Sequence, residues 1–197
     1  MKPLFIVVSA PSGAGKTTLC DLLLESYPEI VYSVSCTTRT PRVNEEDGID
    51  YHFIPEETFA RFVKEDRFLE HATVHDNSYG TLKEPIYDAM KQNLCVLLDI
   101  DVKGAQQVRA SLAKLPKDDP MREGFVDIFI NPPSLEELGN RLRKRATDDP
   151  EVIERRINNA QEEMTHAKEY MYQVTNDDLS IAYRRLCDII NVKSGIL

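Results

Sequence analysis

A glycine-rich segment near the amino terminus reads Ala10-Pro11-Ser12-Gly13-Ala14-Gly15-Lys16-Thr17. Before it lies Leu4–Ser9, a short apolar run rich in Val and Ile, and after it lies Thr17–Tyr27, where leucines recur at helical spacing. Short apolar runs of this kind are typical of buried strands in parallel sheets. A buried strand, a glycine-rich turn and a helix in this order predict an α/β fold.

The same segment, residues 10–17, matches the pattern of a phosphate-binding loop, except that Ala10 stands where glycine is usual. Glycines at two inner positions allow successive backbone N–H groups to face one anion, and the following helix adds its positive end. Lys16 can reach the β- and γ-phosphates of a nucleotide, and the Thr17 hydroxyl can ligate Mg²⁺. The predicted contacts of the nucleoside triphosphate are Ser12, Gly13, Ala14, Gly15, Lys16, Thr17 and Thr18. The loop alone does not identify the reaction, because GTPases, ATP motors and small-molecule kinases share it.

The composition of the whole chain excludes some classes of protein and of partner. The 197 residues suit one domain, and the net charge of −9 argues against nucleic acid or an anionic membrane as a partner. The four cysteines form no C-x-x-C pair, and the apolar run at the start is too short for a signal peptide or a membrane span. We expect a reduced, cytoplasmic protein, and we leave open whether it forms a homo-oligomer.

Further strands and helices are predicted along the chain. Buried strands are expected at Cys95–Ile100 and Phe125–Ile130, short antiparallel strands within Ser33–Phe53, and extended chain at Phe68–Val74 and Val174–Asn176. Helices are expected at Pro55–Lys64, Lys83–Gln92, Val102–Leu112 and Ser180–Ile190, after the capping box at Ser134, and from Asp149-Pro150 through Met171. Asn77–Gly80 reads as a turn and Ala113–Gly124 as a surface loop.

A series of sequence blocks resembles the guanylate kinase family. The blocks are SAPSGAGKTTL (9–19), SVSCTTRTPR (33–42), DGIDYHF (47–53), FLEHATV (68–74), SYGT (78–81), LLDIDVKGAQQV (97–108), FINPPSLEEL (129–138), NNAQEEM (158–164) and TNDD (175–178). Their order is the family's order, which is far more specific than any single block. The resemblance implies a three-part enzyme that uses ATP and Mg²⁺ to phosphorylate GMP.

The resemblance also implies how the chain is divided. A three-layer parallel-sheet core (1–32, 97–133 and 161–197) binds ATP, a small mixed or antiparallel insertion (33–96) binds GMP, and a helical lid (134–160) closes over the phosphates. The segment from 112 to 125 is longer than the family's usual connection, and its role is left open.

Two arginines and two tyrosines are expected at the phosphate of GMP. Arg39 and Arg42 are three residues apart, and arginine forks suit phosphate oxygens better than lysine does. By resemblance, Tyr51 and Tyr79 complete this site by donating phenolic hydrogen bonds. The alternative is that both arginines form surface ion pairs with Glu45 and Glu46.

The purine base has its own expected contacts. Guanine offers two donors, N1–H and N2–H, on one edge, and a single carboxylate can accept both. Glu70 matches the family's base-reading acid, Ser35 matches its donor to O6, and Thr81 can also reach the nucleotide. The alternative for Glu70 is an outward-facing strand residue, which is the usual place of glutamate.

The remaining candidates lie on the core and the lid. Asp99 and Asp101 share one side of a strand end, where one can organise Mg²⁺ and the other contact GMP; we favour Asp99 near the metal, with helix capping as the alternative. By resemblance Arg141, Arg145 and Arg156 are lid arginines that join Lys16 and Arg39 in catalysis, and Asn176 lies near the adenine side of ATP. An exposed basic helix face is the alternative for the first two arginines. No general base is needed, because the phosphate oxygen of GMP is already an anion.

The sequence therefore predicts transfer of the γ-phosphate of ATP to GMP, with dGMP as a second expected acceptor. Two alternatives stay open: a catalytically inactive guanylate-kinase-like module that binds phosphorylated partners, and a kinase for another nucleoside monophosphate or a GTPase. The intact Gly13, Gly15, Lys16 and Thr17 argue against the first, and the Ser35 and Glu70 pair argues against the second.

Overall fold

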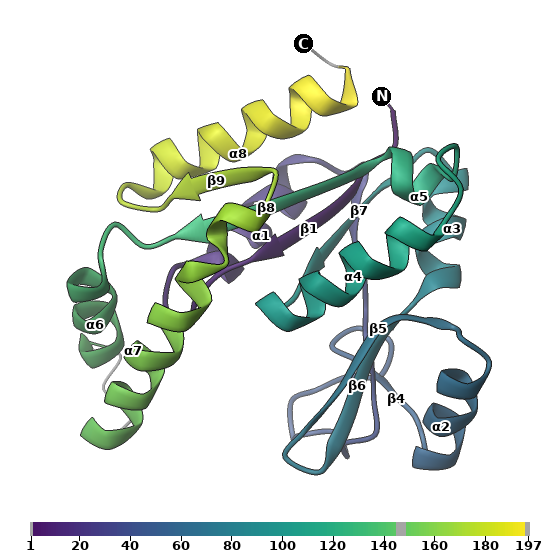
Figure 1. The fold of residues 1–197 in the computed structure, drawn as a ribbon, viewed down its shortest axis with the longest axis horizontal. Helices are drawn as coiled ribbons and strands as arrows, with labels where there is room; N and C mark the ends of the chain where they lie inside the picture. The colour runs from purple at the N-terminus through teal and green to yellow at the C-terminus, as the bar shows by residue number, and fades with distance from the viewer. Residues whose placement is uncertain (1, 145–148, 196–197) are drawn as a thin grey trace.

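A computed structural model describes residues 2–144 and 149–195. Its centre is a five-stranded sheet, the main sheet, with strand order β2-β7-β1-β8-β9 and every neighbouring pair parallel (Figure 1). The strands are β1 (Phe5–Ser9), β2 (Ile30–Tyr32), β7 (Cys95–Asp99), β8 (Phe125–Asn131) and β9 (Tyr172–Thr175). The predicted α/β fold with a parallel sheet is confirmed.

Side chains alternate between the two faces of the main sheet, and helices cover both faces. Leu4, Ile6 and Val8 pack in one core cluster with α1 (Lys16–Ser26) and α8 (Leu179–Ser194). Phe5 and Val7 point the other way, into a cluster with α3 (Lys83–Lys91) and α4 (Val102–Lys114). Leu4 and these four residues of β1 are at most 2% exposed. This two-sided burial explains why the strand reads as a continuous apolar run.

A second sheet, the small sheet, has strand order β4-β3-β6-β5 and lies beside α2 (Glu56–Lys64). Its strands are β3 (Cys36–Thr37), β4 (His52–Phe53), β5 (Phe68–Val74) and β6 (Asn77–Leu82). Phe59 of α2 stacks on Phe68 of β5 at 4.5 Å between ring centroids, which attaches the helix to the sheet.

Two helices form the other projection from the core. They are α6 (Leu135–Lys144) and α7 (Pro150–Thr165), and η1 (Ala167–Glu169) then leads into β9. The Ser134 hydroxyl accepts from the Glu137 amide at 3.0 Å, as a cap requires. Figure 1 shows these helices and the small sheet projecting from the same side of the main sheet, in the lower left and lower right of the view.

The β5–β6 hairpin corrects one prediction. Asn77–Gly80 is not a turn but most of β6, and the turn lies at His75 and Asp76, with φ of 47° and 64°. Two successive positive φ values define the tight hairpin turn whose twist matches the flanking strands. Aspartate tolerates that backbone better than most residues, so the turn forms without glycine.

Other element boundaries also differ from the predictions. The expected loop at 113–124 contains the end of α4 and the short helix α5 (Pro120–Glu123), which buries Met121 completely. The long helix ends at Thr165 rather than continuing through Met171, which is exposed. Strands β3 and β4 pair in parallel, although the other pairs of the small sheet are antiparallel. Strand β2, at the edge of the main sheet, was not predicted.

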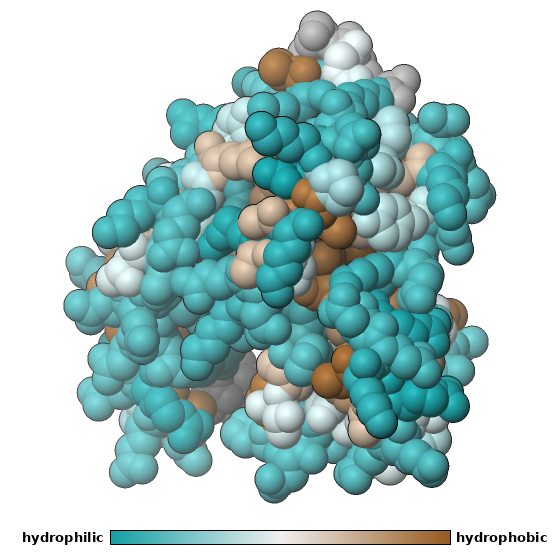
Figure 2. Space-filling view, turned by 45° about the vertical axis from the view of Figure 1, so that its right-hand side comes forward, coloured by the Kyte–Doolittle hydropathy of each residue, from teal (hydrophilic) through white to brown (hydrophobic). Residues whose placement is uncertain are grey.

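The face of the molecule in Figure 2 is mostly hydrophilic, with hydrophobic side chains gathered mainly along its middle. Within residues 2–144 and 149–195, no helix has both the length and the apolar character needed to cross a membrane.

Candidate active site

The phosphate loop, residues 10–17, joins β1 to α1 and adopts the conformation that its glycines permit. Gly13 and Gly15 have φ of 94° and 91°, in the left-handed region that favours glycine. The Ala14 amide donates to the Pro11 carbonyl at 3.0 Å, which closes the loop. A cavity of about 320 Å³ is lined by residues 10–13 and 15–18, whereas the predicted contact Ala14 is buried. The cavity lies at the amino-terminal end of α1, where backbone N–H groups attract anions.

Lys16 is held over this cavity by a carboxylate from the neighbouring strand. Its Nζ lies 3.2 Å from Oδ2 of Asp99, the last residue of β7. The Tyr32 hydroxyl, from edge strand β2, donates to the other oxygen of Asp99. Burial, followed by the charge of Asp99, raises the pKa of Tyr32 above its ordinary value, so this hydroxyl keeps its proton. The ammonium and carboxylate therefore meet at a fixed place before any nucleotide binds.

The oxygen atoms around the loop suit Mg²⁺. Thr17 and Asp99, the two predicted metal residues, line one cavity of about 250 Å³. Hydroxyl and carboxylate oxygens are the ligands that Mg²⁺ prefers, usually together with water and substrate phosphates. In the described part of the chain no group of three or more His, Cys, Asp or Glu side chains is placed to hold a metal. Mg²⁺ at Thr17 and Asp99 would therefore take its other ligands from nucleotide and water.

Helices α6 and α7 contact the phosphate loop directly. A Cβ atom at Gly13 would lie 3.0 Å from Leu142 and 3.1 Å from Leu138, so α6 lies close against this glycine. From α7, Nη2 of Arg156 donates to the Ser12 hydroxyl at 2.5 Å. Arg156 therefore lies at the phosphate loop in this conformation.

The other two lid arginines differ from Arg156. Arg141 forms an ion pair with Glu137, one helical turn earlier, at 3.3 Å from Nε to Oε1. The alternative of a helix-surface arginine therefore describes Arg141 in this conformation. Arg145 lies outside the described residues.

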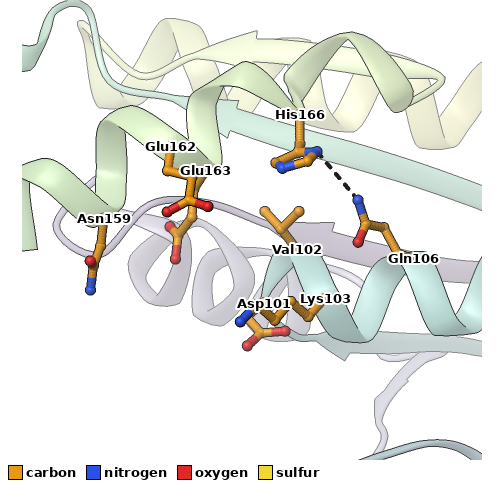
Figure 3. Close-up of a pocket in the computed structure, with 8 residues that line it drawn as sticks. All are labelled: Asp101, Val102, Lys103, Gln106, Asn159, Glu162, Glu163 and His166. Atoms are coloured by element: carbon orange, nitrogen blue, oxygen red, sulfur yellow. Dashed lines mark hydrogen bonds between the residues drawn. The ribbon is translucent and has the colours of Figure 1, made fainter.

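Two carboxylates from different helices border the phosphate loop. Asp101 caps α4, accepting from the Gly104 amide at 2.7 Å, so the capping alternative applies to this residue. It also lines the phosphate-loop cavity, together with Glu163 of α7. Both residues line a second cavity of about 280 Å³ between α4 and α7, where Figure 3 shows a hydrogen bond between two other lining residues, Gln106 and His166. Burial, then the charge of Asp101, raises the pKa of Glu163.

The arginine loop, residues 38–50, brings three of the four predicted phosphate ligands together. The guanidinium of Arg39 lies 5.6 Å from the Tyr51 ring, whose centroid is 5.9 Å from that of Tyr79. Arg39 is occupied by Glu45, with both of its terminal nitrogens 2.9 Å from the two carboxylate oxygens. Arg42 is exposed, and its backbone amide donates to Glu45 at 2.8 Å. The ion-pair alternative therefore holds for Arg39 in this structure.

That ion pair also changes the titration of its members. Hydrogen bonds to Glu45 and then to Tyr79 raise the pKa of Arg39, and the same arginine lowers the pKa of Glu45. Both groups therefore carry their charge at neutral pH. In this structure the charge of Arg39 is therefore neutralised by Glu45, a residue of the same loop.

Three predicted base-reading residues converge on the small sheet. Glu70 is only 9% exposed, so the outward-facing alternative is wrong. Its Oε1 accepts from the Thr81 hydroxyl at 2.6 Å, and Thr81 Oγ1 lies 3.2 Å from the Ser35 hydroxyl. Burial raises the pKa of Glu70, although the Thr81 hydrogen bond acts in the opposite direction. The buried Glu70 carboxylate is thus hydrogen-bonded to the Thr81 hydroxyl, which in turn contacts the Ser35 hydroxyl.

Core helix α4 fixes the strand that carries Glu70. Ser111 donates to the Leu69 carbonyl at 2.8 Å, and Gln107 accepts from the His71 amide at 3.2 Å. These contacts lie on either side of Glu70, and their two residues share one helical face. They join the small sheet to the core.

The last predicted residue, Asn176, lies against the phosphate loop. It directly follows β9, and its side-chain Nδ2 donates to the Ala14 carbonyl at 2.8 Å. It is 6% exposed.

Four residues with contacts in the site were not among the predicted ones: Tyr32, Gln107, Ser111 and Glu163. A signal existed for Glu163, because it follows Arg156 by seven residues and so shares its face of α7. The other three act through contacts between residues far apart in the chain, which no local pattern shows.

Comparison with known proteins gives one consistent result. The guanylate kinase family model matches residues 2–193. A guanylate kinase of Rickettsia bellii is 42% identical over 189 residues, covering 96% of this chain and 94% of the relative. One from Paramagnetospirillum magneticum is 47% identical, covering 89% and 78%.

The fold agrees with a solved structure as well. The crystal structure of guanylate kinase from Anaplasma phagocytophilum has a TM-score of 0.71 at 33% identity, covering 98% of this chain and 86% of that one. With the family model spanning nearly every residue and the phosphate loop, buried acid and arginine loop in place, this chain belongs to the guanylate kinase family.

Proposed function

We propose that this protein transfers the γ-phosphate of ATP to GMP, giving ADP and GDP, and that it accepts dGMP as well. The observation that carries the proposal is the pairing of two unlike anion sites on one chain. The phosphate loop offers backbone amides and Lys16 over a 320 Å³ cavity. The arginine loop offers Arg39 beside Tyr51 and Tyr79, and the small sheet offers the buried Glu70.

The reaction needs only positioning and charge neutralisation. A phosphate oxygen of GMP attacks the γ-phosphorus, the bond from that phosphorus to the β–γ bridging oxygen breaks, and ADP leaves with the electron pair. The nucleophile is already ionised, so no proton has to move first. Bound between Thr17 and Asp99, Mg²⁺ would neutralise charge on the phosphates of ATP.

Each protein group has a defined part in this reaction. Lys16 is within reach of the phosphates, and Arg156 lies at Ser12, beside the cavity. Arg141 and Arg145 would join them when the lid, residues 134–160, closes over the core and the GMP-binding region, 33–96. Arg39, Arg42, Tyr51 and Tyr79 would hold the GMP phosphate, and closure would expel water from between the two nucleotides.

Selectivity for guanine follows from Glu70. A buried carboxylate can accept from both N1–H and N2–H of guanine, whereas adenine would place the lone pair of N1 against it. A site built around particular base donors rejects a base that lacks them by about 10⁴-fold, because buried polar groups are then left unpaired. Ser35 and Thr81 would contact the nucleotide beside this acid, since Thr81 donates to Glu70 and the Ser35 hydroxyl lies 3.2 Å from that of Thr81.

We further propose that the protein works in the cytoplasm and binds neither nucleic acid nor membranes. Its net charge of −9 supports this, because such partners are themselves anionic.

The test is coupled ADP formation with each nucleoside monophosphate in turn. We expect turnover with GMP and dGMP, and rates with AMP, CMP and UMP that are lower by orders of magnitude. Equal rates with AMP or UMP would overturn the assignment of Glu70. Thermal stabilisation by GMP without any ADP formation would instead identify an inactive binding module.

A further inference from the structure

Asn176 occupies a place that suits the phosphate loop rather than an adenine base. Its backbone amide donates to the Asn131 carbonyl at the end of β8, which anchors it to the main sheet. Its side chain is buried, and the amide nitrogen Nδ2 is already committed to the Ala14 carbonyl at 2.8 Å. A side chain in that position has little surface left to present to a base.

The side chain also fits tightly against the backbone of the loop. A Cβ atom on Gly15 would lie 2.2 Å from Nδ2 of Asn176, far closer than non-bonded atoms approach. The amide group thus rests on the Cα of Gly15, in the space that only glycine leaves open. Because of this close fit, the Ala14–Gly15 peptide cannot rotate without moving the side chain of Asn176.

The contact of Asn176 with the Ala14 carbonyl also determines where the next backbone N–H points. In a trans peptide the carbonyl of one residue and the N–H of the next point in opposite directions. Holding the Ala14 carbonyl toward Asn176 therefore directs the Gly15 N–H away from it. Gly15 immediately precedes α1, so its N–H is one of the free donors at the helix end that borders the phosphate cavity.

We propose that Asn176 is a positioning residue for phosphate binding: it fixes the Ala14–Gly15 peptide so that the Gly15 N–H faces the nucleotide phosphates. The inference rests on the proposed function of the loop as the ATP site. Asparagine suits the task because its amide donates without a charge. An aspartate of the same shape would set a carboxylate against the Ala14 carbonyl and beside the phosphates.

The test separates this role from an adenine contact. It measures inhibition by Mg-tripolyphosphate, which has phosphates but no base, and the ratio of kcat/KM for ATP to that for GTP. The variants are Asn176→Asp, which keeps the volume, and Asn176→Ala. The control is Asn131→Ala, which removes a side-chain hydrogen bond to Gln173 nearby but leaves the Asn131 carbonyl in place.

A positioning role predicts parallel losses. In Asn176→Ala, the inhibition constant of tripolyphosphate and the KM for ATP should rise together, by about 3–10-fold, as expected for one lost hydrogen bond. Asn176→Asp should show a larger rise, since it adds repulsion. The ATP-to-GTP ratio and the KM for GMP should stay within about 2-fold, and Asn131→Ala should match the wild type.

Other results would overturn the proposal. A changed ATP-to-GTP ratio with unchanged tripolyphosphate inhibition would make Asn176 an adenine contact. Variants that bind tripolyphosphate as the wild type does would remove any role in the loop. If Asn176→Ala unfolds, Asn176→Asp decides the matter alone. Failure of the wild type to bind tripolyphosphate would refute the proposed function of the loop, which is a separate outcome.

Discussion

The phosphate loop and the arginine loop are both proposed to bind phosphate groups, yet they are built in opposite ways. The phosphate loop is held closely by its neighbours: Leu138 and Leu142 lie on Gly13, Asn176 lies on Gly15, and Lys16 is paired with Asp99. The arginine loop is open. Its residues 40–44 are all exposed, and Val43 is fully so.

The difference follows from what supplies the positive charge. A backbone amide points in the direction that the backbone conformation sets. A site made of several amides therefore needs packing that holds the backbone in one conformation before the ligand binds. A guanidinium on a loop needs an internal counterion while the substrate is absent, and Glu45 is that counterion for Arg39. We infer that ATP meets a preformed site, whereas GMP has to replace an existing ion pair.

The largest expected effect tests the packed site. Lys16→Ala should lower kcat by about 10²–10³-fold, because a cation aimed at the transferring group is lost. The fold should persist, since Lys16 is a side chain at the cavity rather than in a core cluster. Steady-state kinetics and thermal unfolding measure the two effects separately.

Lys91→Ala is the matched control, because it removes an exposed lysine that forms an ion pair with Asp88, three residues earlier on the same helix. It should leave kcat unchanged. Near-normal turnover in Lys16→Ala would show that the packed loop is not the catalytic phosphate site.

The two regions also differ in how far the sequence predicted them. The phosphate loop is local: strand, glycines and helix are consecutive, so their pattern specified the structure, including the positive φ at Gly13 and Gly15. The members of the base-reading group are up to 46 residues apart, as Ser35 and Thr81 are, and only the family resemblance pointed to them.

What the sequence did not predict depends on contacts between distant segments. Strand β2 is three residues long and exists because it pairs with β7 at the sheet edge. Met121 reads as part of a polar loop, yet it is buried because α5 packs between α3 and α4. Arg39 and Glu45 were recognised as an alternative pair, but whether they meet depends on the fold of the loop between them.

A smaller effect tests the open site. Arg39→Lys keeps the charge but loses the two-pronged geometry, so the KM for GMP should rise by about 10²-fold, as for the loss of one or two charge-assisted hydrogen bonds. The KM for ATP should change by less than about 3-fold. Initial-rate measurements with each substrate varied in turn give both values.

Glu45→Gln tests the same ion pair and should change the KM for GMP in the opposite direction. It weakens the internal competitor of the phosphate while keeping the shape of the side chain. The KM for GMP should fall by about 2–3-fold, which is the scale of an ion pair near the surface. A KM that rises as much as it does in Arg39→Lys would mean that Glu45 builds the site rather than occupying it.

A further test concerns Glu70, a buried residue of the small sheet. Burial raises the folded-state pKa of Glu70 above its unfolded value near 4.5, so the folded protein binds more protons across that interval. Stability is therefore full below the unfolded pKa and declines as pH rises through the folded pKa. Glu70→Gln removes this decline, and its melting temperature should exceed that of the wild type at pH 7, with the gap narrowing toward pH 4.

The same substitution should lower kcat/KM for GMP by about 10-fold, because the amide of glutamine accepts only one of guanine's two donors and opposes the other. Glu57→Gln, on the exposed start of α2, should change neither quantity. A Glu70→Gln variant with unchanged GMP kinetics would show that this buried acid supports the sheet and does not read the base. A higher melting temperature together with a lower kcat/KM for GMP would instead show that the small sheet is less stable because it keeps a buried acid for recognition. The phosphate loop differs, because the contacts that shape it also stabilise the core.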